Sequence, residues 1–91
     1  MNREEIRSKI KEIIATVADL DPGDIADSAH FFDDLSLDSL SLLEIGVDLD
    51  YEFRLAAPDL DERIKTVQTM PQAVELVATM LEEKNSRAEV A

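Results

Sequence analysis

Apolar residues recur at helical spacing in three separate segments of this chain, and no segment shows the alternating pattern of a convincing β-strand. The first segment covers residues 3–19, the second runs from residue 38 or 39 to residue 53 or 54, and the third starts after Thr69. Between the last two segments, residues 60–64 have room only for a short helical turn. The pattern therefore predicts an all-α protein.

The start of the last helix is well defined by its sequence. Thr69 and Gln72 have the spacing of a capping box, and Pro71 then falls in the first turn, where its missing N–H costs nothing. A start at Thr66 would place Pro71 in the helix interior, at a cost of about 3 kcal/mol. We therefore expect Thr69 to be the N-cap.

The first two helices are separated by a loop of roughly twenty residues, which is long for a compact domain and suggests a functional segment. We expect the loop to be ordered and held against the core, because it contains several large apolar side chains: Ile25, Phe31, Phe32, Leu35 and Leu37. A chain of 91 residues makes one domain, which we place at residues 1–84, with a flexible C-terminal tail over residues 85–91.

The second helix has two apolar stripes instead of one. At helical spacing, Leu42, Ile45, Leu49 and Phe53 form the face expected to pack in the core. A second stripe lies almost opposite and is set among acidic residues; its members and neighbours are Leu40, Val47, Tyr51, Leu43, Glu44, Asp48 and Asp50. This second stripe is either a docking face for another protein or further core packed beneath the long loop.

Negative charge is concentrated in one part of the chain. Residues 12–53 contain 12 acidic residues and no Lys or Arg, so this stretch accounts for the formal net charge of −12. Nucleic acids and anionic membranes would be repelled, and the natural partners are basic protein surfaces. No apolar run approaches the length of a membrane span, and residues 2–5 do not fit a signal peptide. We therefore expect a cytoplasmic monomer with no membrane insertion.

Conventional catalysis and metal binding find little support. The only histidine, His30, lies in the long loop, where local hydrogen bonding is the simpler role. The chain has no cysteine for thiolate chemistry or metal ligation. Asp19, Asp21 and Asp24 suggest a calcium loop, but counting from Asp19 the sixth residue is Asp24 instead of Gly and the twelfth is His30 instead of Glu. We expect neither an enzyme nor a metal site.

Ser39 stands at the start of the two-striped helix, within the sequence Asp38-Ser39-Leu40. Taken alone, a serine here is explained by helix capping, which is worth about 1 kcal/mol. Ser36 and Ser41 lie nearby, so residue type does not single out Ser39. The ordered loop before it, the second stripe behind it and the acidic surroundings favour a site that partner enzymes approach.

These residues resemble the acyl carrier protein family. The resemblance covers nearly the whole chain and centres on residues 31–40, an aromatic residue followed by Asp-Leu and then Asp-Ser-Leu. Leu43-Glu44 and the helix end Tyr51-Glu52-Phe53 fit the same family pattern. The resemblance implies a four-helix bundle with a long first loop and a short third helix.

The resemblance also implies the function and its cofactor. Ser39 would be esterified by 4'-phosphopantetheine, which a separate phosphopantetheinyl transferase takes from coenzyme A. Acyl intermediates of fatty-acid or polyketide-type biosynthesis would then be carried as thioesters on this arm, and Asp38 and Leu40 would flank the attachment site. The absence of cysteine fits, because the working thiol would belong to the arm.

Partner contacts are implied in the same way. Asp38, Glu44 and Asp50 match positions at which the family presents acids to basic patches, and Leu40 and Val47 match its apolar contacts. With the rest of the second stripe, the expected partner-binding set is Leu40, Glu44, Val47, Asp48, Asp50 and Tyr51. The partners would be the transferase and the acyl-transferring and chain-elongating enzymes. Gly46 departs from the family pattern, which commonly has a branched residue there near the acyl pocket.

Two other interpretations remain open at the level of sequence. A peptidyl or D-alanyl carrier would share the modified serine and differ in cargo and partners. An unmodified acidic helical adaptor would use Ser39 only as a helix cap and bind proteins through the second stripe. The adaptor predicts no modification and binding that is insensitive to Ser39→Ala.

Overall fold

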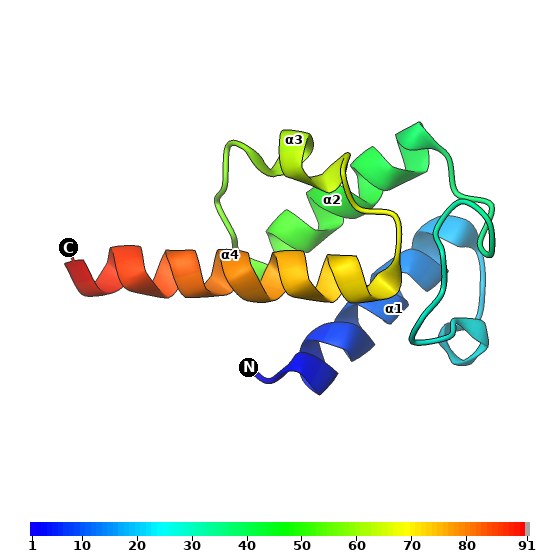
Figure 1. Ribbon diagram of the computed structural model, residues 1–91, viewed down its shortest axis with the longest axis horizontal. Coiled ribbons are helices and arrows are strands. Elements are labelled where there is room, and N and C mark those ends of the chain that lie inside the picture. Colours follow the sequence, from blue (N-terminus) through cyan, green and yellow to red (C-terminus); the bar gives the residue numbers. More distant parts are fainter. Residues whose placement is uncertain (91) are drawn as a thin grey trace.

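The computed structural model describes residues 1–90, with side chains described for residues 1–86. Four α-helices follow one another: α1 (Arg3–Ala18), α2 (Ser39–Phe53), α3 (Leu60–Ile64) and α4 (Met70–Val90), with a short 3-10 helix η1 (Pro22–Asp24) in the first loop (Figure 1). Residues 1–90 contain no named strand, only an isolated bridge between His30 and Thr69. The prediction of an all-α fold with a short third helix is confirmed.

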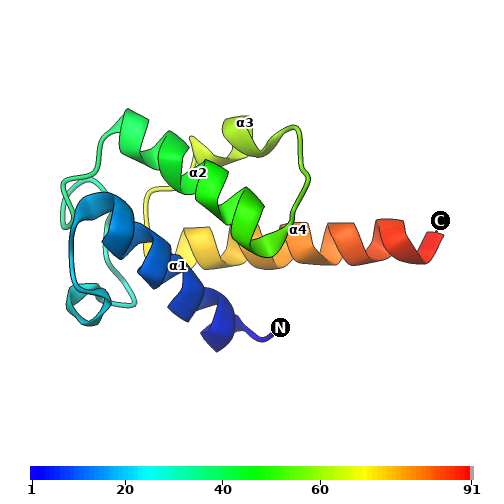
Figure 2. The ribbon, with the colours of Figure 1, turned by 180° about the vertical axis from the view of Figure 1, so that it is seen from behind.

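The helices surround one apolar core. α1 packs against both α2 and α4, while the short α3 spans the space between α2 and α4. Figure 2 shows α1 and α2 in the nearer layer and α4 in the farther one. The most deeply buried side chains come from every α-helix, from the long loop and from the turn after α2: Ile6, Ile10, Ile14, Phe31, Ile45, Leu49, Leu55, Ile64, Met70 and Val77.

Each long helix begins at a polar cap that the sequence contains. In α1, the Asn2 side chain accepts a hydrogen bond from the Glu5 N–H at 2.9 Å. In α4, the Gln72 N–H donates to Thr69 Oγ1 at 3.3 Å and the Thr69 N–H donates to Gln72 Oε1 at 3.2 Å. This is the predicted capping box, with Pro71 in the first turn. α1 ends at Ala18, one residue earlier than expected, and the next residue, Asp19, has a positive φ.

The long loop is fixed to the core, as expected. Phe31 is fully buried, and its N–H donates to the Gln68 carbonyl at 2.7 Å. The Met70 N–H donates to the Ala29 carbonyl at 3.0 Å, so the loop and the start of α4 are joined by two backbone hydrogen bonds. Phe32, another of the large apolar residues of the loop, is 37% exposed, because the adjacent Phe31 takes the inward position.

The last helix is longer than the sequence suggested. α4 continues to Val90, so residues 85–90 form its final turns, which project beyond the other helices in Figure 1. The flexibility expected of residues 85–91 stays a prediction, and residue 91 lies outside the described chain. Within residues 1–90, no helix combines the length and the apolar character that crossing a membrane requires.

Candidate functional site

Ser39 is the first residue of α2, and it is not the residue that caps this helix. The cap is Asp38, whose carboxylate accepts the Ser41 N–H at 2.8 Å. Ser39 is exposed, and within the described chain its hydroxyl makes no hydrogen bond. The simplest structural role for Ser39, that of a cap, is therefore already filled by its neighbour, and the hydroxyl is accessible for chemistry.

The capping hydrogen bonds also affect the acidity of Asp38. The Ser41 N–H, and then the Ser41 side chain, stabilise the charged carboxylate and lower its pKa below the ordinary Asp value. Asp38 therefore remains ionised at neutral pH and adds negative charge at the residue that precedes Ser39.

This lowered pKa predicts a specific dependence of stability on pH. The stabilisation from ionised Asp38 is fully present above the ordinary Asp pKa of about 3.9 and is lost as the pH falls through the lowered pKa of the folded state. Asn can also cap a helix, but it lacks the negative charge that the Ser41 hydrogen bonds stabilise, and it does not titrate. We therefore expect Asp38→Asn to be less stable than the wild type at neutral pH and to approach it in acid. Urea midpoints of both proteins at several pH values measure this, and a gap that stays constant with pH would contradict it.

Beside Ser39 the surface is hollowed into a cavity of about 300 Å³. Its walls come from the loop before α2, from α2 itself and from the end of α3. The residues that line it together with Ser39 are Phe32, Leu42, Leu43, Ile64 and Lys65. An accessible hydroxyl next to apolar walls and a single cation suits a group that has an anionic end and an apolar continuation.

The second stripe of α2 faces solvent. Leu40, Val47 and Tyr51 are 73%, 64% and 84% exposed, whereas Leu43 is half-buried beside the cavity. Glu44 and Asp48 are exposed on the same face. Three large, solvent-exposed apolar side chains that are flanked by acidic residues form a surface suited to docking another protein. Below, "the α2 face" means Leu40, Glu44, Val47, Asp48 and Tyr51.

Asp50 differs from the other predicted contact residues. It is half-buried, and its carboxylate accepts the Ala56 N–H at 2.8 Å. This hydrogen bond closes the turn after α2, in which Arg54 and Ala56 have φ values of 51° and 49°. Left-handed backbone is costly for such residues, so the Asp50 carboxylate compensates for strain in this turn. Its local role is structural, and no pattern in the sequence predicted this role.

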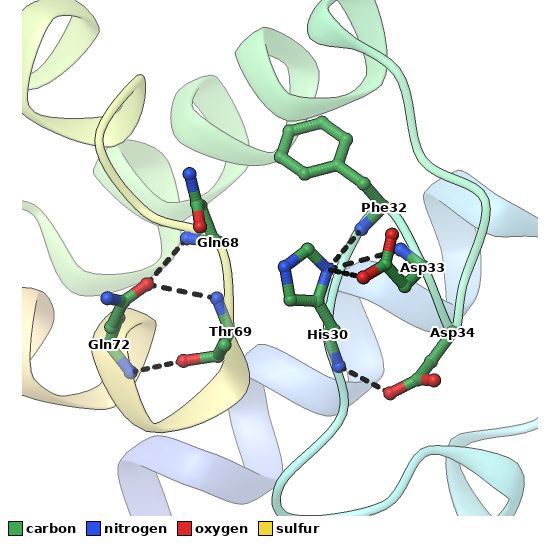
Figure 3. A network of polar contacts seen from close by, with 7 residues as sticks. All are labelled: His30, Phe32, Asp33, Asp34, Gln68, Thr69 and Gln72. Atoms are coloured by element: carbon green, nitrogen blue, oxygen red, sulfur yellow. Dashed lines mark hydrogen bonds and ion pairs between the residues drawn. The ribbon is translucent and has the colours of Figure 1, made fainter.

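His30 has the local role that its loop position suggested. The ring Nδ1 of His30 accepts hydrogen bonds from the backbone N–H groups of Phe32 and Asp33, at 3.2 and 3.1 Å (Figure 3). The backbone N–H of His30 donates to the Asp34 carboxylate at 2.7 Å. The Asp33 carboxylate also lies 3.7 Å from Nδ1. Because Nδ1 is engaged by two backbone N–H groups of the loop itself, His30 serves the local structure of the loop.

The sequence did not reveal that Phe32 and Lys65 lie beside Ser39. They come from different parts of the chain, and only the packing of α3 against α2 brings Lys65 to the cavity. Gly46, which departs from the family pattern, is buried against the same helix: a Cβ there would lie 3.5 Å from Ile64 Cγ2, an ordinary contact. In the described chain, no group of three or more His, Asp or Glu side chains is placed to hold a metal ion.

Comparison with known proteins gives consistent matches. Residues 8–74 match the family model described as the phosphopantetheine attachment site. An acyl carrier protein of Bdellovibrio bacteriovorus is 40% identical over 71 residues, which cover 77% of this chain and 91% of the relative. One of Thermosynechococcus vestitus is 41% identical over 69 residues, covering 75% and 85%. The meromycolate extension acyl carrier protein of Mycobacterium leprae is 34% identical over 89 residues, covering 98% and 76%.

Proposed function

Because the chain belongs to the acyl carrier protein family, and so carries acyl groups on a phosphopantetheine arm in fatty-acid or polyketide-type synthesis, we propose that Ser39 is the residue that bears the arm. The observation that carries this proposal is the accessible Ser39 hydroxyl at the first position of α2, released from capping by Asp38. Members of this family are carriers and not catalysts, and we propose that this chain likewise has no activity of its own.

The residues around Ser39 fit a phosphopantetheine. Ser39 Oγ would form a bond to the phosphorus that carries the pantetheine, and the phosphoanhydride bond of coenzyme A would break. The leaving group is adenosine 3',5'-bisphosphate, and the hydroxyl proton passes to a base on the transferase. The cavity beside Ser39 offers apolar walls along the start of the arm. When bound, the group supplies the thiol on which acyl groups are held as thioesters.

The absence of cysteine makes this proposal easy to test. The unmodified chain has no thiol, so a thiol-specific reagent responds only to the arm. After incubation with coenzyme A and a broad-specificity phosphopantetheinyl transferase, followed by removal of free coenzyme A, we expect one thiol per chain. A chain that gains none, under conditions that load another acyl carrier protein, would overturn the proposal.

We also propose that the α2 face is where partner enzymes dock. Leu40, Val47 and Tyr51 supply apolar area, and the exposed acids between them attract basic surfaces. The transferase and the acyl-transferring and chain-elongating enzymes are the proposed partners. Asp50 is left out of this face because its carboxylate is used within the turn after α2. A monomeric state and a cytoplasmic location belong to the same proposal.

Reversing two charges on the α2 face is expected to slow docking. In Glu44→Lys/Asp48→Lys, the association rate with the transferase should fall by about tenfold at low salt, because electrostatic steering is lost. The difference should shrink as the ionic strength rises. Stopped-flow kinetics measures both effects. The matched control is Glu4→Lys/Glu82→Lys, which makes the same change in net charge on exposed positions of α1 and α4. Equal slowing in both variants would mean that net charge, and not the α2 face, guides association.

A further inference from the structure

The cavity beside Ser39 contains one basic side chain, and the following inference rests on the attachment of the arm to Ser39 proposed above. Lys65 follows the last residue of α3 and lines the same cavity of about 300 Å³ as Ser39. The other lining residues are apolar except for Ser39 itself. A cation and an accessible hydroxyl therefore line the same cavity, in a part of the molecule where acidic residues predominate.

The segments around Ser39 are acidic, so the positive charge of Lys65 stands out among them. Residues 12–53, which contain α2 and the loop before it, include no Lys or Arg, so Lys65 reaches the cavity from a different element. Asp38 is adjacent to Ser39 and is kept ionised by its capping hydrogen bonds. A phosphodiester at Ser39 would add a further negative charge next to this carboxylate, and the nearby positive charge of Lys65 would offset it.

Lys65 is only weakly engaged by other groups. Its ion pair is with Glu62 at 3.8 Å, and both side chains are largely exposed. By contrast, Lys9 pairs with Glu52 at 2.9 Å and Arg63 pairs with Glu83 at 2.8 Å, contacts that join separate helices. An exposed ion pair at the longer distance contributes little. Lys65 can therefore exchange Glu62 for a phosphate at small cost.

The start of α2 alone is a limited binding site for a phosphate. The Ser41 N–H already donates to the Asp38 carboxylate and the Leu42 N–H to the Asp38 carbonyl, at 2.8 and 3.0 Å. Only the first N–H groups of the helix are left to face an anion on Ser39. A charge-assisted hydrogen bond from a lysine ammonium would supply the missing stabilisation.

We propose that Lys65 binds the phosphate of the phosphopantetheine arm and thereby directs the arm into the cavity between α2 and α3. In this arrangement the phosphate would lie at Lys65, and the next carbon of the arm, which bears two methyl groups, would lie among the apolar lining residues Phe32, Leu43 and Ile64. A cavity of about 300 Å³ is at the lower end of ligand-pocket sizes, which suits this first section of the arm. Lys65 is thus a positioning residue for the arm.

The test compares loaded wild-type protein with loaded Lys65→Gln and Lys65→Arg. We expect nuclear Overhauser contacts between the Lys65 side chain and the arm's methyl groups, and a phosphorus NMR resonance that shifts in Lys65→Gln but stays near the wild-type position in Lys65→Arg. The arm's methyl groups should also lose their contacts with Phe32 and Ile64 in Lys65→Gln. Lys84→Gln is the matched control: it removes the same charge from the C-terminal half of α4, which lies at the opposite end of the molecule from the start of α2 (Figure 1).

Each outcome decides the question. The expected pattern in Lys65→Gln, absent from Lys84→Gln, supports the role of Lys65. Identical phosphorus resonances and identical arm contacts in wild type and Lys65→Gln would overturn it and leave attachment at Ser39 intact. Equal changes in both Gln variants would also overturn it, because net charge alone would explain them. If no variant gains a thiol, the proposed attachment falls, and the role of Lys65 falls with it.

Discussion

Ser39→Ala is expected to abolish loading with phosphopantetheine completely, which is the largest effect of any single change in this chain. The reaction needs an accessible hydroxyl oxygen as the nucleophile, and alanine has none. The backbone should not be disturbed, because Asp38 and not Ser39 caps α2. Intact-protein mass after incubation with coenzyme A and a phosphopantetheinyl transferase measures the result as the gain or absence of one phosphopantetheine.

Two neighbouring serines provide the controls. Ser36 is exposed in the loop with a φ of 55°, and Ser41 is half-buried in α2 with its N–H bonded to Asp38. Ser36→Ala and Ser41→Ala should both load to one phosphopantetheine per chain. If Ser39→Ala still gained mass while either of the other two did not, the attachment site would have been assigned to the wrong serine.

The helices and their starts could be predicted from the sequence because the information for them is local. Helical spacing of apolar residues identified the core face of α2, and the capping box at Thr69 and Gln72 fixed the start of α4. Ser39 could be singled out by its resemblance to a family motif. Each of these signals lies within a few residues of the feature that it predicts.

Other parts of the site depend on contacts between distant segments, and no local pattern encodes them. Lys65 reaches the cavity beside Ser39 only because α3 packs against α2. Asp50 looked like one more surface acid, but its hydrogen bond to Ala56 depends on the path of the turn after the helix. In the pair Phe31-Phe32, the sequence contains two identical side chains, and the one that turns inward is Phe31, whose N–H donates to the distant Gln68 carbonyl.

The second large effect is expected from removing the buried member of this pair, Phe31. Phe31→Ala is expected to lower the free energy of unfolding by about 3–5 kcal/mol, because it removes a fully buried aromatic side chain and leaves a cavity. The loss is large beside the roughly 5–15 kcal/mol typical of a whole domain. It should also loosen the loop before Ser39, since the Phe31 carbonyl accepts the Leu37 N–H at 3.0 Å. Urea denaturation followed by circular dichroism measures the change in free energy.

Phe32→Ala is the matched control, because it makes the same chemical change at the adjacent position. Because Phe32 is 37% exposed, its replacement by alanine should lower the free energy of unfolding by about 1 kcal/mol or less. Its loss should instead affect the cavity beside Ser39, which Phe32 lines, and so alter the arm's contacts in the loaded protein. Equal destabilisation by the two substitutions would mean that the loop is not held by Phe31 alone. A larger loss for Phe32→Ala would reverse the assignment of which phenylalanine anchors the loop and which borders the site.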